Sequence, residues 1–207
     1  MFDVINLGCI RGERRLFRGL SFSASSGDLV ELRGANGSGK TSLLRILCGL
    51  AQPAEGEVRW EGENIRSLGE EYFGSLAYVA HQNGVKDELT AVENLRIASG
   101  VAGISLGERP ALEILARIGL AKEAYLPTRF LSAGQRRRVA LARLLAIKAK
   151  LWILDEVLTS LDTAATELSA RFIGEHLNGG GMAIIATHQD LNISARATQR
   201  LEISSVG

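Results

Sequence analysis

The stretch Leu29-Val-Glu-Leu-Arg-Gly-Ala-Asn-Gly-Ser-Gly-Lys-Thr41 decides the fold of this chain. Its first five residues, 29–33, are typical of a strand, and residues 34–41 match the phosphate-binding pattern GxxxxGK(S/T). Residues 41–50 have helical periodicity and end near Gly49. Backbone N–H groups of a glycine-rich loop, followed by the positive end of a helix, bind phosphates. The stretch therefore predicts a nucleotide site between a strand and a helix.

A second stretch, Leu151-Trp-Ile-Leu-Asp-Glu156, is an apolar strand-like run that ends in two acids. Ligands of open α/β sheets gather at the carboxyl edge of the strands. We therefore expect Asp155 to hold Mg²⁺ through water and Glu156 to polarise the attacking water. Without the phosphate-binding loop, the same two acids would be ordinary solvated side chains. In that loop, Lys40 would reach the β- and γ-phosphates, and the Thr41 hydroxyl would bind Mg²⁺.

Length and composition suit one globular domain. The chain has 207 residues, of which 46% are hydrophobic and 23% charged, so it is not disordered and can bury a sizeable core. The net charge of +1 favours neither nucleic acid nor an acidic surface as a partner. No stretch approaches the ~20 apolar residues of a membrane-spanning helix, and residues 1–15 lack the layout of a signal peptide. With Cys9 and Cys48 expected as reduced thiols, these features predict a cytoplasmic protein.

The order of strand-like and helix-like stretches predicts an α/β fold with a mainly parallel sheet. Residues 1–30 look like an antiparallel strand layer with turns at Gly12 and Gly27. Residues from about 85 to 130 have helical spacing without a strand-like run. We therefore expect one domain over residues 1–207, with an α/β core of residues 1–84 and 131–207 and an inserted helical subdomain over about 85–130.

A third stretch, Leu131-Ser-Ala-Gly-Gln135, begins a predicted helix. Ser132 suits the N-cap, and Gly134 lets a phosphate approach the backbone. In this order and spacing, the three stretches resemble those of the nucleotide-binding domain of ATP-binding-cassette (ABC) transporters, a P-loop NTPase fold, and the resemblance covers essentially the whole chain. It implies an ATPase that acts when two copies close into a head-to-tail homodimer. The third stretch, the ABC signature, then binds the γ-phosphate held by the opposite copy.

The resemblance also assigns residues that are uninformative alone. Gln82 follows the strand-like run 76–80, at the place of the Q-loop glutamine that senses Mg²⁺ and couples to the membrane partner. His188 follows the run 182–187, at the place of the switch histidine that contacts the γ-phosphate. Residues 159–162 resemble the D-loop that crosses the dimer interface.

The expected site residues fall into three groups. The catalytic group is Lys40, Glu156 and His188. The metal group, for Mg²⁺, is Thr41, Gln82 and Asp155. The group that contacts ATP is Arg11, Gly34, Asn36, Gly37, Ser38, Gly39, Lys40, Thr41, Ser42, Gln82, Ser132, Gly134, Gln135 and Asp162.

A narrower resemblance lies in the segments between the motifs. Residues 9–22, 41–58, 81–95 and 179–191 look like the ATP-binding subunit of the cytochrome c maturation exporter, a family usually called haem exporters. This resemblance implies separate membrane-spanning permease subunits as partners and a place on the cytoplasmic face of the bacterial inner membrane. It also implies a part in haem export or delivery for c-type cytochromes. No residue of the sequence looks like a direct haem ligand with a matching partner.

Two positions depart from the usual ABC pattern. The family places an aromatic residue before the P-loop to stack on adenine, and alignment by residues 19–22 puts Arg11 there. An arginine plane also stacks on a base, and the cytochrome c maturation family often has arginine at this place. A proline usually follows the acid pair, whereas Val157 follows Glu156 here. Because proline restricts the preceding residue, we predict slower hydrolysis than in a Val157→Pro variant.

Other functions fit the sequence less well. An exporter ATPase for another solute would share the chemistry, and only the segments between the motifs disfavour it. A soluble ABC protein for nucleic-acid or ribosome work usually has twin cassettes or long coiled-coil insertions, which this chain lacks. A binding module without turnover conflicts with the catalytic residues, and a P-loop kinase leaves residues 131–135 unexplained. The arginines at 136–138 are better interpreted as a charged helix face near nucleotide phosphates than as a nucleic-acid site.

Overall fold

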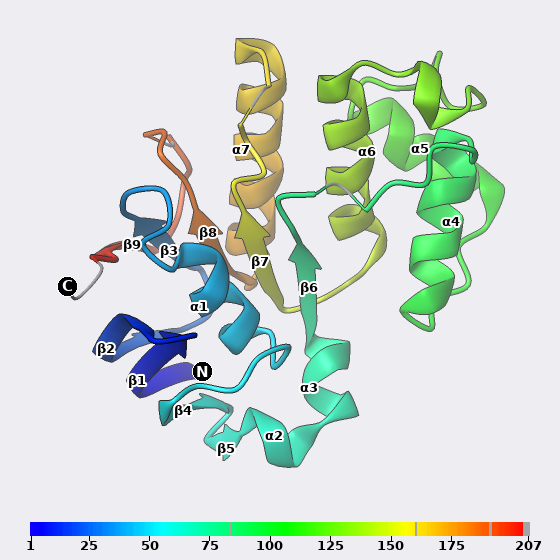
Figure 1. Cartoon of the computed structure of the whole chain (residues 1–207). Coiled ribbons are helices and arrows are strands. Elements are labelled where there is room, and N and C mark those ends of the chain that lie inside the picture. The colour runs from blue at the N-terminus through cyan, green and yellow to red at the C-terminus, as the bar shows by residue number, and fades with distance from the viewer. Residues whose placement is uncertain (83, 160, 191, 205–207) are drawn as a thin grey trace.

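Two sheets with helices around them make up the computed structural model, which describes residues 1–82, 84–159, 161–190 and 192–204 (Figure 1). The antiparallel sheet has the order β2-β1-β4-β5, formed by β1 (Phe2–Arg11), β2 (Arg14–Ala24), β4 (Glu55–Trp60) and β5 (Glu63–Asn64). The second sheet has the order β6-β7-β8-β3-β9, formed by β3 (Asp28–Arg33), β6 (Leu76–Val79), β7 (Leu151–Asp155), β8 (Met182–Ala186) and β9 (Ala197–Glu202). The helices are α1 (Lys40–Leu47), α2 (Ile65–Leu68), α3 (Glu70–Ser75), α4 (Ala91–Val101), α5 (Glu108–Arg117), α6 (Ala133–Ala146), α7 (Thr163–Asn178) and the 3-10 turn η1 (Thr128–Phe130).

All neighbouring strands of the second sheet run parallel, as the sequence predicts. Every residue of β7 and β8 is buried, because these continuous apolar runs are covered on both faces. Parallel pairing also brings the carboxyl ends of β3, β7 and β8 to one edge of the sheet. The loops that carry the predicted nucleotide residues begin at this edge.

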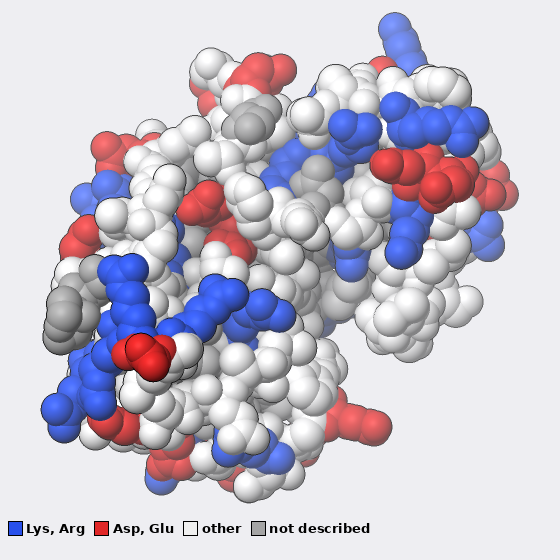
Figure 2. Space-filling view, in the orientation of Figure 1, with Lys and Arg blue, Asp and Glu red and all other residues white. Residues whose placement is uncertain are grey.

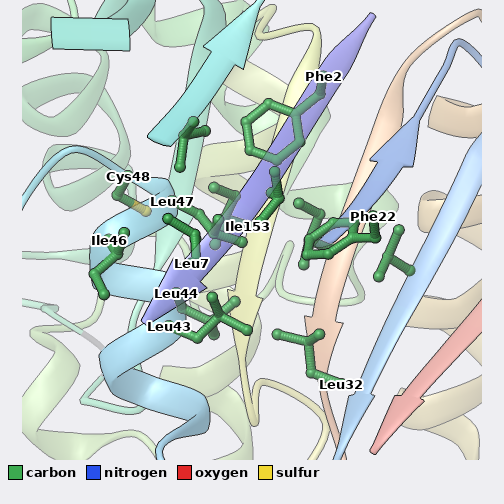
Figure 3. Close-up of a cluster of buried hydrophobic side chains, with 14 of the residues drawn as sticks. Phe2, Leu7, Phe22, Leu32, Leu43, Leu44, Ile46, Leu47, Cys48 and Ile153 are labelled. Carbon is green, nitrogen blue, oxygen red and sulfur yellow. The ribbon is translucent and has the colours of Figure 1, made fainter. Parts of the chain in front are cut away.

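Helix α1 lies between the two sheets (Figure 3). Its residues Leu43, Leu44 and Leu47 are wholly buried, in one cluster with Leu7 of β1 and Ile153 of β7. Removing a buried leucine side chain from such a core costs about 2–5 kcal/mol. This packing fixes α1, and therefore the loop before it, against the central strands.

The predicted helical subdomain is confirmed as a group of helices beside the parallel sheet (Figure 1). Helices α4 and α5 pack on α6 through a separate apolar cluster that includes Leu95, Leu115 and Val139. Helix α4 begins with a capping box, in which the Thr90 side chain accepts from the Glu93 backbone N–H and the Glu93 carboxylate accepts from Thr90 N–H. The exact limits of 85 and 130 stay a prediction.

Some elements differ from the sequence expectation. The turn at Gly12 joins β1 to β2, and β2 ends at Ala24, before the expected limit of about residue 30. The expected strand before the P-loop is β3, which lies in the parallel sheet. Strand β9, an exposed polar segment at the sheet edge, was not predicted.

Cys9 and Cys48 are buried thiols without a disulfide, as expected from the sequence. Within the described residues, no helix is both long and apolar enough to cross a membrane.

Candidate nucleotide and hydrolysis site

The P-loop, residues 34–41, connects the carboxyl end of β3 to α1. Gly39, with φ 110°, forms the N-terminal boundary of α1, and Gly34 has φ 143°. A Cβ at position 34 would lie 2.2 Å from the Ile203 carbonyl oxygen, so the backbone passes where only glycine fits. The loop therefore turns tightly onto the helix, whose N-terminal N–H groups attract phosphate.

Lys40 is only 5% exposed, and its ammonium group lies over the P-loop. The Nζ atom donates to the carbonyl oxygens of Gly34 at 2.7 Å and Ala35 at 3.2 Å. It also lies 3.2 Å from His188 Nε2 and 3.7 Å from Glu156 Oε1. The structure thus brings together the three residues that were predicted to be catalytic.

Asp155 ends β7 and is 1% exposed. Burial raises the pKa of its carboxyl group, while a hydrogen bond from Thr41 acts in the opposite direction. Its Oδ2 atom is buried without a hydrogen-bond partner among the described residues. Oxygens of a carboxylate, a hydroxyl and a side-chain amide suit Mg²⁺, which keeps several waters and binds substrate phosphates as well. The predicted set of Thr41, Gln82 and Asp155 therefore fits this ion.

Glu156 has a left-handed backbone, with φ 52°. Its Oε1 atom lies 3.4 Å from His188 Nε2, and its Oε2 atom lies 3.6 Å from His81 Nδ1. The Glu156 carboxylate therefore has three nitrogen atoms nearby, from Lys40, His81 and His188. The contact with His81 was not predicted, because nothing in the sequence indicates that this histidine faces the acid pair.

Two adjoining clefts run along the P-loop. The first, of about 360 Å³, is lined by residues that include Arg11, Asn36, Gly37, Gly39, Lys40, Thr41, Ser42 and Glu156. The second, of about 750 Å³, is lined by residues that include Asn36, Gly37, Thr41, Gln82, Asp155 and Glu156. Arg14, which pairs with Arg11 across the β1–β2 turn, also lines the first cleft and was not predicted. Ser38, by contrast, is buried and does not line either cleft.

The signature residues Ser132, Gly134 and Gln135 lie away from these clefts, at the start of α6. Figure 1 places α1 and α6 on opposite sides of β6 and β7. The Ser132 hydroxyl accepts from Gln135 N–H at 3.1 Å, and the Gln135 side chain accepts from Ser132 N–H at 2.8 Å. This capping box pairs two N–H groups at the start of α6. The contact of these residues with a nucleotide held by a second copy stays a prediction.

Asp162 also caps a helix, since its Oδ1 atom accepts from Ala165 N–H at 2.7 Å at the start of α7. Ser160, inside the predicted D-loop, lies outside the described residues. The role of Asp162 at a dimer interface stays a prediction.

The three arginines after the signature do not form one charged face near phosphates. Arg137 is 5% exposed and turns into the protein. Arg138 donates to the carbonyl oxygens of Ile118 at 3.1 Å and Gly119 at 3.4 Å, at the end of α5. On the face in Figure 2, basic and acidic side chains lie close to one another and do not form one large basic patch. The sequence could not reveal that Arg137 and Arg138 face inward, because their acceptors are backbone carbonyls far away along the chain.

Comparisons with known proteins agree with this geometry. A family model described as ABC transporter matches residues 17–159. A cytochrome c biogenesis ATP-binding export protein CcmA from Nitrosospira multiformis is 56% identical over 200 residues, which cover 97% of each chain. The protein of the same name from Nitrosomonas europaea is 53% identical over 204 residues, covering 99% of this chain and 96% of that one.

Solved structures have the same fold. An ABC transporter ATP-binding protein from Pyrococcus furiosus has a TM-score of 0.86 at 20% identity, with 99% of both chains covered. A dimeric ATP-binding cassette in a post-hydrolysis state, bound to ADP and Pi, has a TM-score of 0.83 at 26% identity and covers 98% of this chain and 96% of its own. The chain belongs to the ABC transporter family, among the cytochrome c biogenesis ATP-binding export proteins.

Proposed function

We propose that this ABC ATPase drives a membrane complex in haem export or delivery for the biogenesis of c-type cytochromes. The observation that carries the hydrolytic part is the cluster at one sheet edge, where Glu156 lies within 3.7 Å of both Lys40 and His188. The cytochrome c part is supported by the 56% and 53% identical relatives, whose names give this role.

Binding of ATP rests on the P-loop. Its backbone N–H groups and Lys40 hold the β- and γ-phosphates, and Arg11 stacks on the base from the other wall of the cleft. Thr41, Asp155 and Gln82 are the residues that would hold Mg²⁺, which neutralises developing phosphate charge when it is bound. The buried Oδ2 atom of Asp155, which has no hydrogen-bond partner within the described part of the chain, supports this assignment.

Hydrolysis rests on positioning. The Glu156 carboxylate orients and polarises the attacking water, and His188 contacts the γ-phosphate from the neighbouring strand end. Lys40 Nζ lies 3.7 Å from Glu156 Oε1, so the ammonium group lies next to both the P-loop and this carboxylate. The residues therefore supply a charge clamp and an oriented base.

The assembly has two copies in head-to-tail orientation. Ser132, Gly134 and Gln135 of one copy complete the site of the other, and Asp162 crosses between them. ATP binding closes this dimer and hydrolysis opens it. Gln82 and the helices over about 85–130 transmit the movement to separate membrane-spanning permease subunits on the cytoplasmic face of the bacterial inner membrane.

A complementation assay tests the proposal. The natural chain, Glu156→Gln and the control Glu113→Gln are expressed in a bacterium that lacks its own cytochrome c maturation ATPase, and covalently bound haem is stained. Glu113 is a matched control because it is an exposed acid of α5 that pairs with Arg109. We expect c-type cytochromes with the natural chain and with Glu113→Gln, but none with Glu156→Gln.

The ATPase activity of each purified chain separates the two parts of the proposal. Active natural chain without restored cytochromes would contradict the cytochrome c role and favour another cargo. Restored cytochromes with Glu156→Gln would contradict the hydrolytic role of this residue.

A further inference from the structure

Arg137 connects three segments of the molecule through one buried guanidinium group. It lies in the second turn of α6, four residues from Ala133, and is 5% exposed. Its partners are backbone carbonyl oxygens after β6 and at the end of β7. They are Ala80 at 3.1 Å, His81 at 2.8 Å, Asp155 at 3.3 Å, Glu156 at 2.7 Å and Val157 at 2.9 Å.

Among the described residues, these five contacts use all three nitrogen atoms of the guanidinium, which form a rigid planar fork. One edge of the fork holds the segment that leads to Gln82, and the other holds the backbone around Glu156. A lysine ammonium, with three donors at a single point, could not span both segments. The spacing between the two loops thus depends on the shape of Arg137 and not on its charge alone.

The environment of Arg137 makes the group costly to bury. Burial lowers the pKa of its guanidinium, while the nearby Asp155 and Glu156 act in the opposite direction. Because a buried cation needs compensating contacts, the five carbonyl oxygens and the guanidinium constrain one another. A displacement of α6 would therefore displace both loops.

We propose that Arg137 is a positioning residue that couples the signature end of α6 to the catalytic loop and the Q-loop of the same copy. This inference rests on the proposed dimer, in which the signature contacts the nucleotide of the opposite copy. The occupancy of one ATP site then sets the position of Glu156 and Gln82 in the other. Hydrolysis at the two sites is coupled through Arg137.

Steady-state ATP hydrolysis by the full chain tests this coupling. Arg137→Lys keeps the charge and Arg137→Gln removes it. Arg138→Gln is the matched control, since Arg138 leaves the same helix but donates to carbonyls at the end of α5. For both Arg137 variants we expect kcat to fall about tenfold or more and the Hill coefficient for ATP to approach 1. The KM for ATP should stay within about twofold, because the P-loop is untouched.

Thermal unfolding and the folded fraction are measured on the same samples, and Arg137→Lys serves if Arg137→Gln does not fold. A folded Arg137→Lys with the kcat and Hill coefficient of the natural chain would overturn the inference. Equal losses of kcat in Arg138→Gln and Arg137→Lys at equal losses of thermal stability would also overturn it, because they indicate a structural role. If the natural chain itself lacked ATPase activity, the proposed function would fail instead.

Discussion

Glu156, the predicted catalytic acid, has a strained backbone conformation with φ 52°. A left-handed backbone at a non-glycine residue costs about 1–3 kcal/mol and persists only where the surroundings fix it. At Glu156 the surroundings do so: its N–H donates to the Ala186 carbonyl at 3.0 Å, and its own carbonyl accepts from Thr159 and Arg137. In this conformation the carboxylate lies near Lys40 and His188.

Val157→Pro tests whether this geometry limits turnover. Proline disfavours helical geometry in the residue before it, so the variant would move Glu156 from φ 52° toward an extended backbone. We expect faster ATP hydrolysis by the variant, measured as phosphate release at saturating ATP. Equal or faster turnover by the natural chain would contradict the prediction.

Arg11 lines the first cleft, and its stacking on the base in place of the usual aromatic residue stays a prediction. We predict that Arg11→Ala raises the KM for ATP about fivefold, the effect of about 1 kcal/mol of lost stacking, and that Arg11→Tyr restores it. Arg18→Ala is the control, because Arg18 is an exposed arginine of β2 that pairs with Glu55 outside the cleft. Base stacking by Arg11 is refuted if Arg11→Ala and Arg18→Ala have the same KM.

The sequence alone predicts the role of a residue when the motif around it is short and continuous. Lys40 and Asp155 stand inside motifs, so their chemistry follows from the residues next to them. His81 and Arg137 could not be predicted, because their partners are brought near only by the pairing of β6 with β7. The charge of Arg137 suggested an exposed helix face near phosphates, but the side chain is buried and contacts backbone carbonyls instead.

Among the helices, α4 and α6 both begin with a capping box, but the two boxes have different predicted roles. The capping box of α4 uses Thr90 and Glu93, and that of α6 uses Ser132 and Gln135. Both satisfy N–H groups that the helix leaves unpaired. Only the second helix start carries a predicted nucleotide contact.

The two caps can be compared directly by alanine substitution. Thr90→Ala and Ser132→Ala should each lower the free energy of unfolding by about 1 kcal/mol, measured by chemical denaturation. Only Ser132→Ala should also lower kcat for ATP. Similar kcat values for the two variants would show that Ser132 acts as a cap alone.

The cap of α4 also predicts a pH dependence. Hydrogen bonds from the Thr90 backbone and side chain lower the pKa of Glu93. Because the pKa is lower in the folded state, this stabilisation is present above the ordinary carboxyl pKa and is lost as the pH falls through the lowered value. The stability difference between the natural chain and Thr90→Ala should therefore shrink below about pH 4. A difference independent of pH from 3 to 7 would contradict this.

Strongly patterned elements could be predicted, and weakly patterned ones could not. The continuous apolar runs of β7 and β8 predict buried parallel strands. Strand β9 is exposed at five of its six positions and has no alternation, so its pairing with β3 depends on tertiary context.

For the whole molecule, the P-loop and the signature lie apart within one chain. The clefts contain the P-loop, Asp155 and Glu156, whereas α6 begins on the other side of β6 and β7 (Figure 1). A related cassette bound to ADP and Pi is a dimer. We therefore propose that ATP joins the P-loop of one copy to the signature of the other.

The most direct test is a cross-link between two different chains. Asn36→Cys and Ser132→Cys are each introduced into Glu156→Gln, differently tagged, mixed and oxidised with or without ATP; the natural Cys9 and Cys48 are buried. We predict a covalent dimer that contains both tags, only with ATP and only in the mixture. A mixed dimer that forms equally without ATP, or none at all from chains that bind ATP, would contradict the head-to-tail assembly.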